Sequence, residues 1–121
     1  MCADYKFQEK RRCGRWKIGG LVFIKKGDEE IRGFCEDVSF RGIRIIVFRD
    51  LDLSEIFELT LTFPERRPIK TICKVIWKKE ISNNKLRAGL SFLKISDADK
   101  EEIFDYVLKT DPLQLSNSWW R

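Results

Sequence analysis

The chain has 121 residues and no histidine. Without an imidazole it cannot form a Ser-His-Asp or Cys-His catalytic group, or a histidine-based proton shuttle. Its cysteines are too widely spaced for a Cys-x-x-Cys pair, so no metal site is expected; they are Cys2, Cys13, Cys35 and Cys73. No phosphate loop of the G-x-x-x-x-G-K-[ST] type occurs. These absences argue against an enzyme and favour free thiols in a reducing compartment.

Long apolar runs are also missing. No segment approaches the roughly 20 apolar residues that cross a bilayer, and the first residues mix both signs of charge, unlike a secretory signal. We therefore expect a cytoplasmic protein with no membrane span. With 43% hydrophobic and 36% charged residues, the chain has the composition of a single globular domain.

The net charge of +5 is unevenly distributed. The first eighteen residues contain two acidic side chains, and their basic side chains are Lys6, Lys10, Arg11, Arg12, Arg15 and Lys17. Such a basic arm favours a polyanionic partner, which is a nucleotide, a nucleic acid or an acidic membrane surface. Charge alone does not choose among these partners.

Short segments with the pattern of β-strands follow the arm. They cover residues 17–26, 30–38, 42–48, 56–63, 69–80 and 85–93. Turn residues separate most of them, and no helical pattern intervenes. Six strands joined by short loops predict an antiparallel sheet that closes into a barrel or a sandwich, so the fold class is all-β.

Alternation within these segments predicts which side chains face the core. The fourth segment should bury Phe57, Leu59, Leu61 and Phe63, and the second should direct Ile31, Gly33 and Cys35 to one side. In the fifth segment Thr71, Cys73, Val75 and Trp77 are expected to share one face.

The pattern then changes to that of a helix over residues 97–109. Ser96 is a suitable N-cap, and the apolar residues Ile103, Phe104, Val107 and Leu108 recur at helical spacing. This face should pack on the barrel, and Pro112 should end the helix. We expect three parts: a flexible basic arm (1–16), the barrel with its C-terminal helix (17–110) and a tail (111–121) carrying Trp119 and Trp120.

Two short motifs carry the chemistry. Arg11 and Arg15 form an Arg-x-x-x-Arg pair, and Asp37, Ser39 and Gly42 form Asp-x-Ser-x-x-Gly. A guanidinium can pair with phosphate oxygens or a guanine edge and can stack on a base. A carboxylate and a hydroxyl supply the complementary groups for guanine N–H and phosphate oxygens. Either motif alone is common. Together these side chains suit a guanine nucleotide, and their order before a run of strands is the basis of a family resemblance.

This combination resembles the PilZ domain, a bacterial receptor for the second messenger cyclic di-GMP. The later segments 75–77 and 88–92 are also similar to that family, so the resemblance spans about residues 10–109. It implies a stand-alone PilZ protein with a six-stranded antiparallel β-barrel flanked by a C-terminal helix.

The resemblance also implies roles for individual residues. Arg11 and Arg15 should contact a guanine or the phosphates, and Asp37 should accept from guanine N–H groups or hold an arginine. Ser39 should reach a phosphate or a base, and Gly42 should let the backbone approach the ligand. Arg12 and Lys10 are expected to add phosphate contacts. Trp77 and Gly89 are candidates for further contacts, and they fit equally well as structural residues of the barrel.

The sequence thus predicts a receptor, without a cofactor, that binds cyclic di-GMP. Its arm should change conformation and signal to a protein partner in motility, biofilm or secretion control. One alternative is a barrel that binds single-stranded nucleic acid; it is disfavoured because the densest cations lie on the arm. Another is a PilZ-like interaction module that binds no nucleotide. The sequence leaves open whether the protein is a monomer or a dimer.

Overall fold

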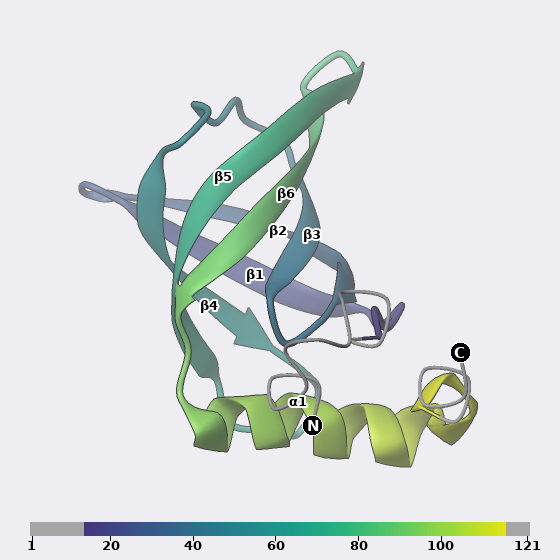
Figure 1. Ribbon diagram of the computed structural model, residues 1–121. Helices are drawn as coiled ribbons and strands as arrows, with labels where there is room; N and C mark the ends of the chain where they lie inside the picture. Colours follow the sequence, from purple (N-terminus) through teal and green to yellow (C-terminus); the bar gives the residue numbers. More distant parts are fainter. Residues whose placement is uncertain (1–13, 116–121) are drawn as a thin grey trace, which may run out of the picture.

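The computed structural model of the chain describes residues 14–115 and contains the expected six strands and C-terminal helix (Figure 1). The elements are β1 (Gly20–Lys26), β2 (Glu29–Val38), β3 (Gly42–Val47), β4 (Ile56–Thr62), β5 (Ile69–Ser82), β6 (Lys85–Lys94) and α1 (Asp97–Thr110). The strands form a closed barrel in the order β1-β2-β3-β6-β5-β4, and all neighbours pair antiparallel. The predicted all-β barrel with a terminal helix is confirmed.

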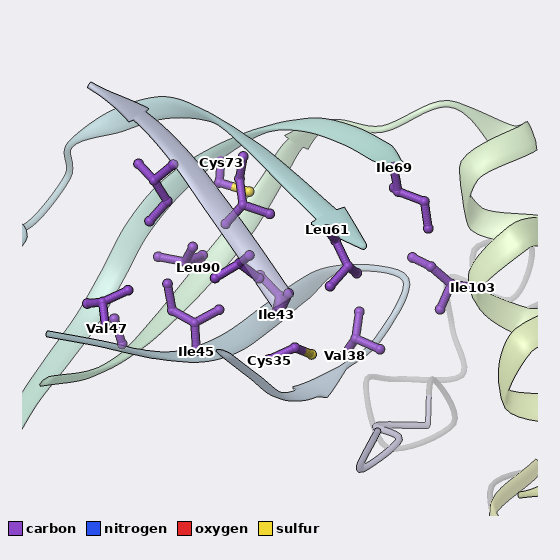
Figure 2. Close-up of a cluster of buried hydrophobic side chains, with 14 of the residues drawn as sticks. Cys35, Val38, Ile43, Ile45, Val47, Leu61, Ile69, Cys73, Leu90 and Ile103 are labelled. Atoms are coloured by element: carbon purple, nitrogen blue, oxygen red, sulfur yellow. The ribbon is translucent and has the colours of Figure 1, made fainter. Parts of the chain in front are cut away.

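The inside of the barrel is filled by aliphatic side chains from alternate strand positions (Figure 2). Ile24, Ile43, Ile45 and Leu59 have no exposed surface. Each such side chain contributes roughly 1.5–3 kcal/mol when removed from water. The alternation predicted for the second and fourth strands is confirmed, since Ile31, Cys35, Phe57, Leu59, Leu61 and Phe63 are all buried.

Helix α1 lies across one end of the barrel (Figure 1). Ser96 is its N-cap, because the Ser96 hydroxyl accepts from the Asp99 backbone N–H at 3.0 Å. Ile103 and Val107 are fully buried, and Figure 2 shows Ile103 directed towards the barrel. Leu108 was expected on the packing face but is 45% exposed, so that part of the prediction is wrong. Fewer of the apolar helix residues are therefore buried against the barrel than their helical spacing predicted.

The fifth strand departs from simple alternation. A bulge between Val75 and Trp77 leaves Ile76 without a direct partner on β6. The extra residue shifts the following side chain to the other face of the sheet. Trp77 is therefore 41% exposed on the outside of the barrel instead of buried with Cys73 and Val75. The prediction that Trp77 shares a face with Cys73 and Val75 is wrong, and the bulge is the reason.

Both ends of the described chain meet beside the barrel. Trp16 is buried, and its ring packs edge-on against Phe40 at a centroid distance of 5.1 Å. The Gln114 side chain accepts from the Lys17 backbone N–H at 2.7 Å and donates to the Lys17 carbonyl at 2.9 Å. The segment leading into β1 is therefore fixed by backbone and side-chain contacts. Among residues 14–115, no helix combines the length and the apolar character needed to cross a membrane.

The cysteines inside the barrel should react slowly with thiol reagents. Burial raises the pKa of Cys35 to about 12 and that of Cys73 to about 11, so both stay protonated at neutral pH. In a variant that keeps only these two cysteines, we expect labelling by a disulfide reagent to be slow in the folded state and rapid in denaturant. Equally rapid labelling in both conditions would show that the thiols are accessible.

Candidate functional site

A short backbone bridge brings the two sequence motifs together. The Trp16 N–H donates to the Val38 carbonyl at 2.8 Å, and the Val38 N–H donates to the Trp16 carbonyl at 3.0 Å. Arg15 therefore lies next to Asp37. Its Nε donates to the Asp37 Oδ1 at 2.5 Å, and its Nη1 donates to the Ser39 Oγ at 3.4 Å. The second arginine of the first motif thus contacts the acidic and hydroxyl residues of the second.

Asp37 is the most enclosed charge of this site. Its side chain is 3% exposed, and its second oxygen, Oδ2, lies 2.6 Å from Nη2 of Arg44 on β3. A buried carboxylate is tolerated only when cations and hydrogen bonds compensate for its lost hydration. Two guanidinium groups provide that compensation here, one from β3 and one from the segment before β1.

Ser39 organises the turn between β2 and β3. Its Oγ accepts from the backbone N–H of Arg41 at 3.1 Å and from that of Gly42 at 3.2 Å. The Ser39 N–H donates to the Gly42 carbonyl at 2.9 Å. The hydroxyl thus holds the turn in place and also faces Arg15.

Gly42 is required by the packing of strand against strand. A Cβ at this position would overlap the carbonyl oxygen of Leu90 on β6, which is backbone and cannot rotate away. This finding gives the glycine a structural reason that the sequence did not indicate.

Gly42→Ala is expected to destabilise the protein by roughly 1–3 kcal/mol, because β3 and β6 would have to separate locally. Chemical denaturation measures this loss. Gly19→Ala is the matched control, since a Cβ at Gly19 meets nothing within 4 Å. Equal stability of the two variants would contradict the close approach of β6.

The site continues as a row across the outer face of the barrel. Asp37 pairs with Arg44, Arg44 with Gly89 on β6, and Gly89 with Trp77 on β5. A Cβ on Gly89 would collide with the Trp77 indole, so the ring lies directly over this glycine. The half-exposed indole therefore offers an aromatic surface on the strands next to the Arg44–Asp37 pair.

A set of charged residues in this row was not identified from the sequence. Arg87 on β6 donates to both oxygens of Glu36, at 2.7 and 3.0 Å, and this pairing lowers the pKa of Glu36. The Arg44 Nε lies 3.5 Å from the same carboxylate. Glu36 is the extra residue of a bulge between Cys35 and Asp37, so it has no direct partner on β3. The one signal in the sequence was Arg44, a charged residue that interrupts an apolar run.

The remaining predicted contacts Lys10, Arg11 and Arg12 lie outside the described residues, as does the tail with Trp119 and Trp120. Within residues 14–115, no cluster of side chains could hold a metal ion. The described part of the site is therefore built from Arg15, Asp37, Ser39 and Arg44, next to the Gly89–Trp77 surface.

One known domain family matches most of the chain. The PilZ domain family matches residues 9–109, which include both motifs and the whole barrel. The chain belongs to the PilZ domain family. No curated protein matches the sequence.

Solved PilZ structures share the fold. The inhibitor of motility MotI/DgrA of Bacillus subtilis has a TM-score of 0.73 and 22% identity, over 87% of this chain and 53% of that chain. The PilZ domain of YcgR from Escherichia coli, solved with c-di-GMP, has a TM-score of 0.71 and 14% identity, over 93% and 100%. The MrkH–c-di-GMP complex of K. pneumonia has a TM-score of 0.67 and 15% identity, over 90% and 55%. The chain thus spans about half the length of MotI and MrkH.

Proposed function

We propose that the chain is a non-enzymatic receptor that binds cyclic di-GMP on the outer face of the barrel. The observation that carries this proposal is the contact of Arg15 with Asp37 and Ser39, which joins the two motifs at one place. Membership of the PilZ family and the solved PilZ structures that contain c-di-GMP support it. The free, buried thiols Cys35 and Cys73 fit a reducing compartment, and we place the receptor in the cytoplasm.

The geometry indicates how the ligand would be recognised. Arg15 has a 48% exposed side chain and can turn from Asp37 towards a phosphate or the O6/N7 edge of a guanine. Asp37 keeps the contact of its Oδ2 with Arg44. Its Oδ1, released by Arg15, can then accept from the guanine N1–H and N2–H groups. The Trp77 ring over Gly89 provides a surface for stacking. The guanine N–H groups of the ligand thereby replace Arg15 as a partner of Asp37, while Arg44 stays in place.

Lys10, Arg11 and Arg12 are proposed to complete the site from the arm. Stacked and paired guanidinium contacts contribute about 1–3 kcal/mol each, whereas ordering the backbone costs about 1–2 kcal/mol per residue. Moderate affinity with a change of arm conformation follows from this balance. We propose that the changed arm presents a new surface to a protein partner in motility, biofilm or secretion control.

Ligand should protect the arm from proteolysis. Trypsin cleaves after Arg11, Arg12 and Arg15, and we expect saturating cyclic di-GMP to slow these cuts as the arm closes over the ligand. Mass spectrometry of timed digests measures this protection. An Arg15→Ala variant, digested in parallel, should lose the protection at Arg11 and Arg12. Identical digestion with and without ligand would rule out the change in arm conformation but not binding itself.

Calorimetric titration with cyclic di-GMP tests the function directly. GTP and cyclic mono-GMP are the matched controls, because they carry the same base but lack the two-fold cyclic backbone. We expect saturable heat with cyclic di-GMP and little with either control. If all three bind equally, the site recognises guanine alone; if none binds, the chain is a PilZ barrel without nucleotide affinity and the proposal fails.

A further inference from the structure

A second positively charged surface lies next to the proposed nucleotide site. The turn between β2 and β3, the end of β6 and the first turn of α1 border a shallow, open hollow of about 550 Å³. The residues used below to define this basic hollow are Arg41, Ser91, Leu93, Lys94, Ile95 and Lys100. The cations come from three different elements and converge on one concave surface.

The cations of the basic hollow have no carboxylate partner within the described part of the chain. Elsewhere on the barrel several arginines are paired closely, as Arg66 is with Glu102 at 2.8 Å and Arg87 with Glu36 at 2.7 Å. Arg41, Lys94 and Lys100 form no ion pair among residues 14–115. Unpaired like charges at close range repel each other and attract an anionic partner.

Lysines on the adjoining strand extend this charge. Lys70 and Lys74 point outward from β5, and Ile72 between them pairs with Lys94 of β6. The positive surface therefore continues from the hollow along the outside of β5.

The apolar lining of the basic hollow has two aliphatic residues, Leu93 and Ile95, and two aromatic ones, Phe40 and Phe92. Leu93 is 51% exposed, and Ile95 is half-buried beside it. The one aromatic ring of the turn, Phe40, is 8% exposed because it packs into the core with Trp16. Phe92 is partly buried and packs against the core. The hollow thus combines unpaired cations with an exposed leucine, and both of its rings are withdrawn towards the core.

We propose that the basic hollow is a docking site for an acidic segment of a protein partner, with carboxylates on Arg41, Lys94 and Lys100 and an apolar side chain on Leu93. A single-stranded nucleic acid would need exposed rings for base stacking, whereas Phe40 is buried and Phe92 packs partly buried against the core. A protruding acidic segment fits both the concave shape and the mixture of charge and aliphatic surface.

The same turn borders the nucleotide site and the basic hollow. The Ser39 hydroxyl accepts from Arg15 on one side and from the Arg41 backbone N–H on the other, and the Phe92 N–H donates to the Arg41 carbonyl at 2.8 Å. A partner in the hollow would therefore lie next to a bound nucleotide. Docking itself needs only the hollow and does not depend on the nucleotide.

The test is fluorescence anisotropy with a labelled short peptide in which Glu and Asp alternate with Leu. Its controls are the same peptide with Gln and Asn in place of the acids, an oligothymidine of similar length and phosphatidylglycerol vesicles. We expect the acidic peptide to bind with an affinity that falls as salt is added, and Lys94→Glu with Lys100→Glu to weaken it at least about tenfold. Amide NMR shifts should map to Leu93 and Lys94.

Lys25→Glu with Lys79→Glu is the matched variant, because it makes the same change in net charge at exposed lysines outside the hollow. It should alter peptide binding by less than about twofold. Equal losses in both double variants, or no binding of the acidic peptide, would overturn the proposal. Tighter binding of oligothymidine or of vesicles than of the peptide would overturn it in favour of a nucleic-acid or membrane surface. If the Lys94/Lys100 variant loses the acidic peptide but still binds cyclic di-GMP like the wild type, the loss belongs to the basic hollow and not to the nucleotide site.

Discussion

Arg15→Ala is expected to weaken cyclic di-GMP binding at least about tenfold, the equivalent of one good bidentate contact. The loss has two origins: the ligand loses a guanidinium, and Asp37 and Ser39 lose the residue that connects them to the arm. The melting temperature should change little, since Asp37 keeps its contact with Arg44 and the Arg15 side chain is half-exposed. Calorimetric titration and thermal unfolding of the same sample measure both effects.

Arg49→Ala is the control for this experiment. Arg49 is also half-exposed and paired with one carboxylate, that of Glu29, but it lies outside the proposed site. Its removal changes net charge by the same amount and should leave affinity unaltered. Wild-type affinity in Arg15→Ala would remove Arg15 from the site, whereas equal losses in both variants would indicate a general charge effect.

Asp37→Ala should reduce both binding and stability. The Asp37 carboxylate is 3% exposed and compensates two guanidinium groups, so its removal leaves Arg15 and Arg44 close together without the buried counter-charge. Breaking one partner of a buried ionic cluster costs roughly 3 kcal/mol. Urea denaturation should show a lower midpoint, and cyclic di-GMP titration should show weak binding or none even well below the new midpoint.

Asp50→Ala is the matched control, because Asp50 pairs with Lys78 through a side chain that is 72% exposed. Its stability should remain close to that of the wild type. Asp37→Asn keeps the size of the side chain but removes its charge. If this variant is as unstable as Asp37→Ala, the lost charge is the main cause of the lost stability. Full stability of Asp37→Ala would mean that the cluster does not support the barrel.

The sequence predicted the barrel well because most of its strands alternate buried and exposed residues and turn residues separate them. Their bounds were close to those observed, and the register of buried residues in β2 and β4 followed from alternation alone. The errors arose where one residue is inserted. The bulge at Ile76 turned Trp77 outward. No local pattern signals this bulge, because it depends on how β5 pairs with β6, where Trp77 lies opposite Gly89.

Only the part of the candidate site whose residues lie close together in the sequence could be predicted. Asp37, Ser39 and Gly42 are close in sequence, so their motif was readable, and the structure places Arg15 against the first two. Arg44, Glu36 and Arg87 were missed because their contacts link three strands and arise only when the barrel closes. The reason for Gly42 was also hidden, since it depends on the carbonyl of Leu90.

If the proposed site binds cyclic di-GMP, the contact between Arg15 and Asp37 would also determine which anions can enter it. In the unliganded protein the Asp37 carboxylate is a tethered competitor for the Arg15 guanidinium, held at 2.5 Å and therefore at a very high effective concentration. A simple phosphate must displace this competitor and offers nothing to the released carboxylate. A guanine nucleotide replaces both partners at once, because its phosphates take the arginine and its N–H groups take the aspartate. In the proposed receptor, the Arg15–Asp37 contact would therefore favour guanine nucleotides over simple phosphate even before a ligand binds.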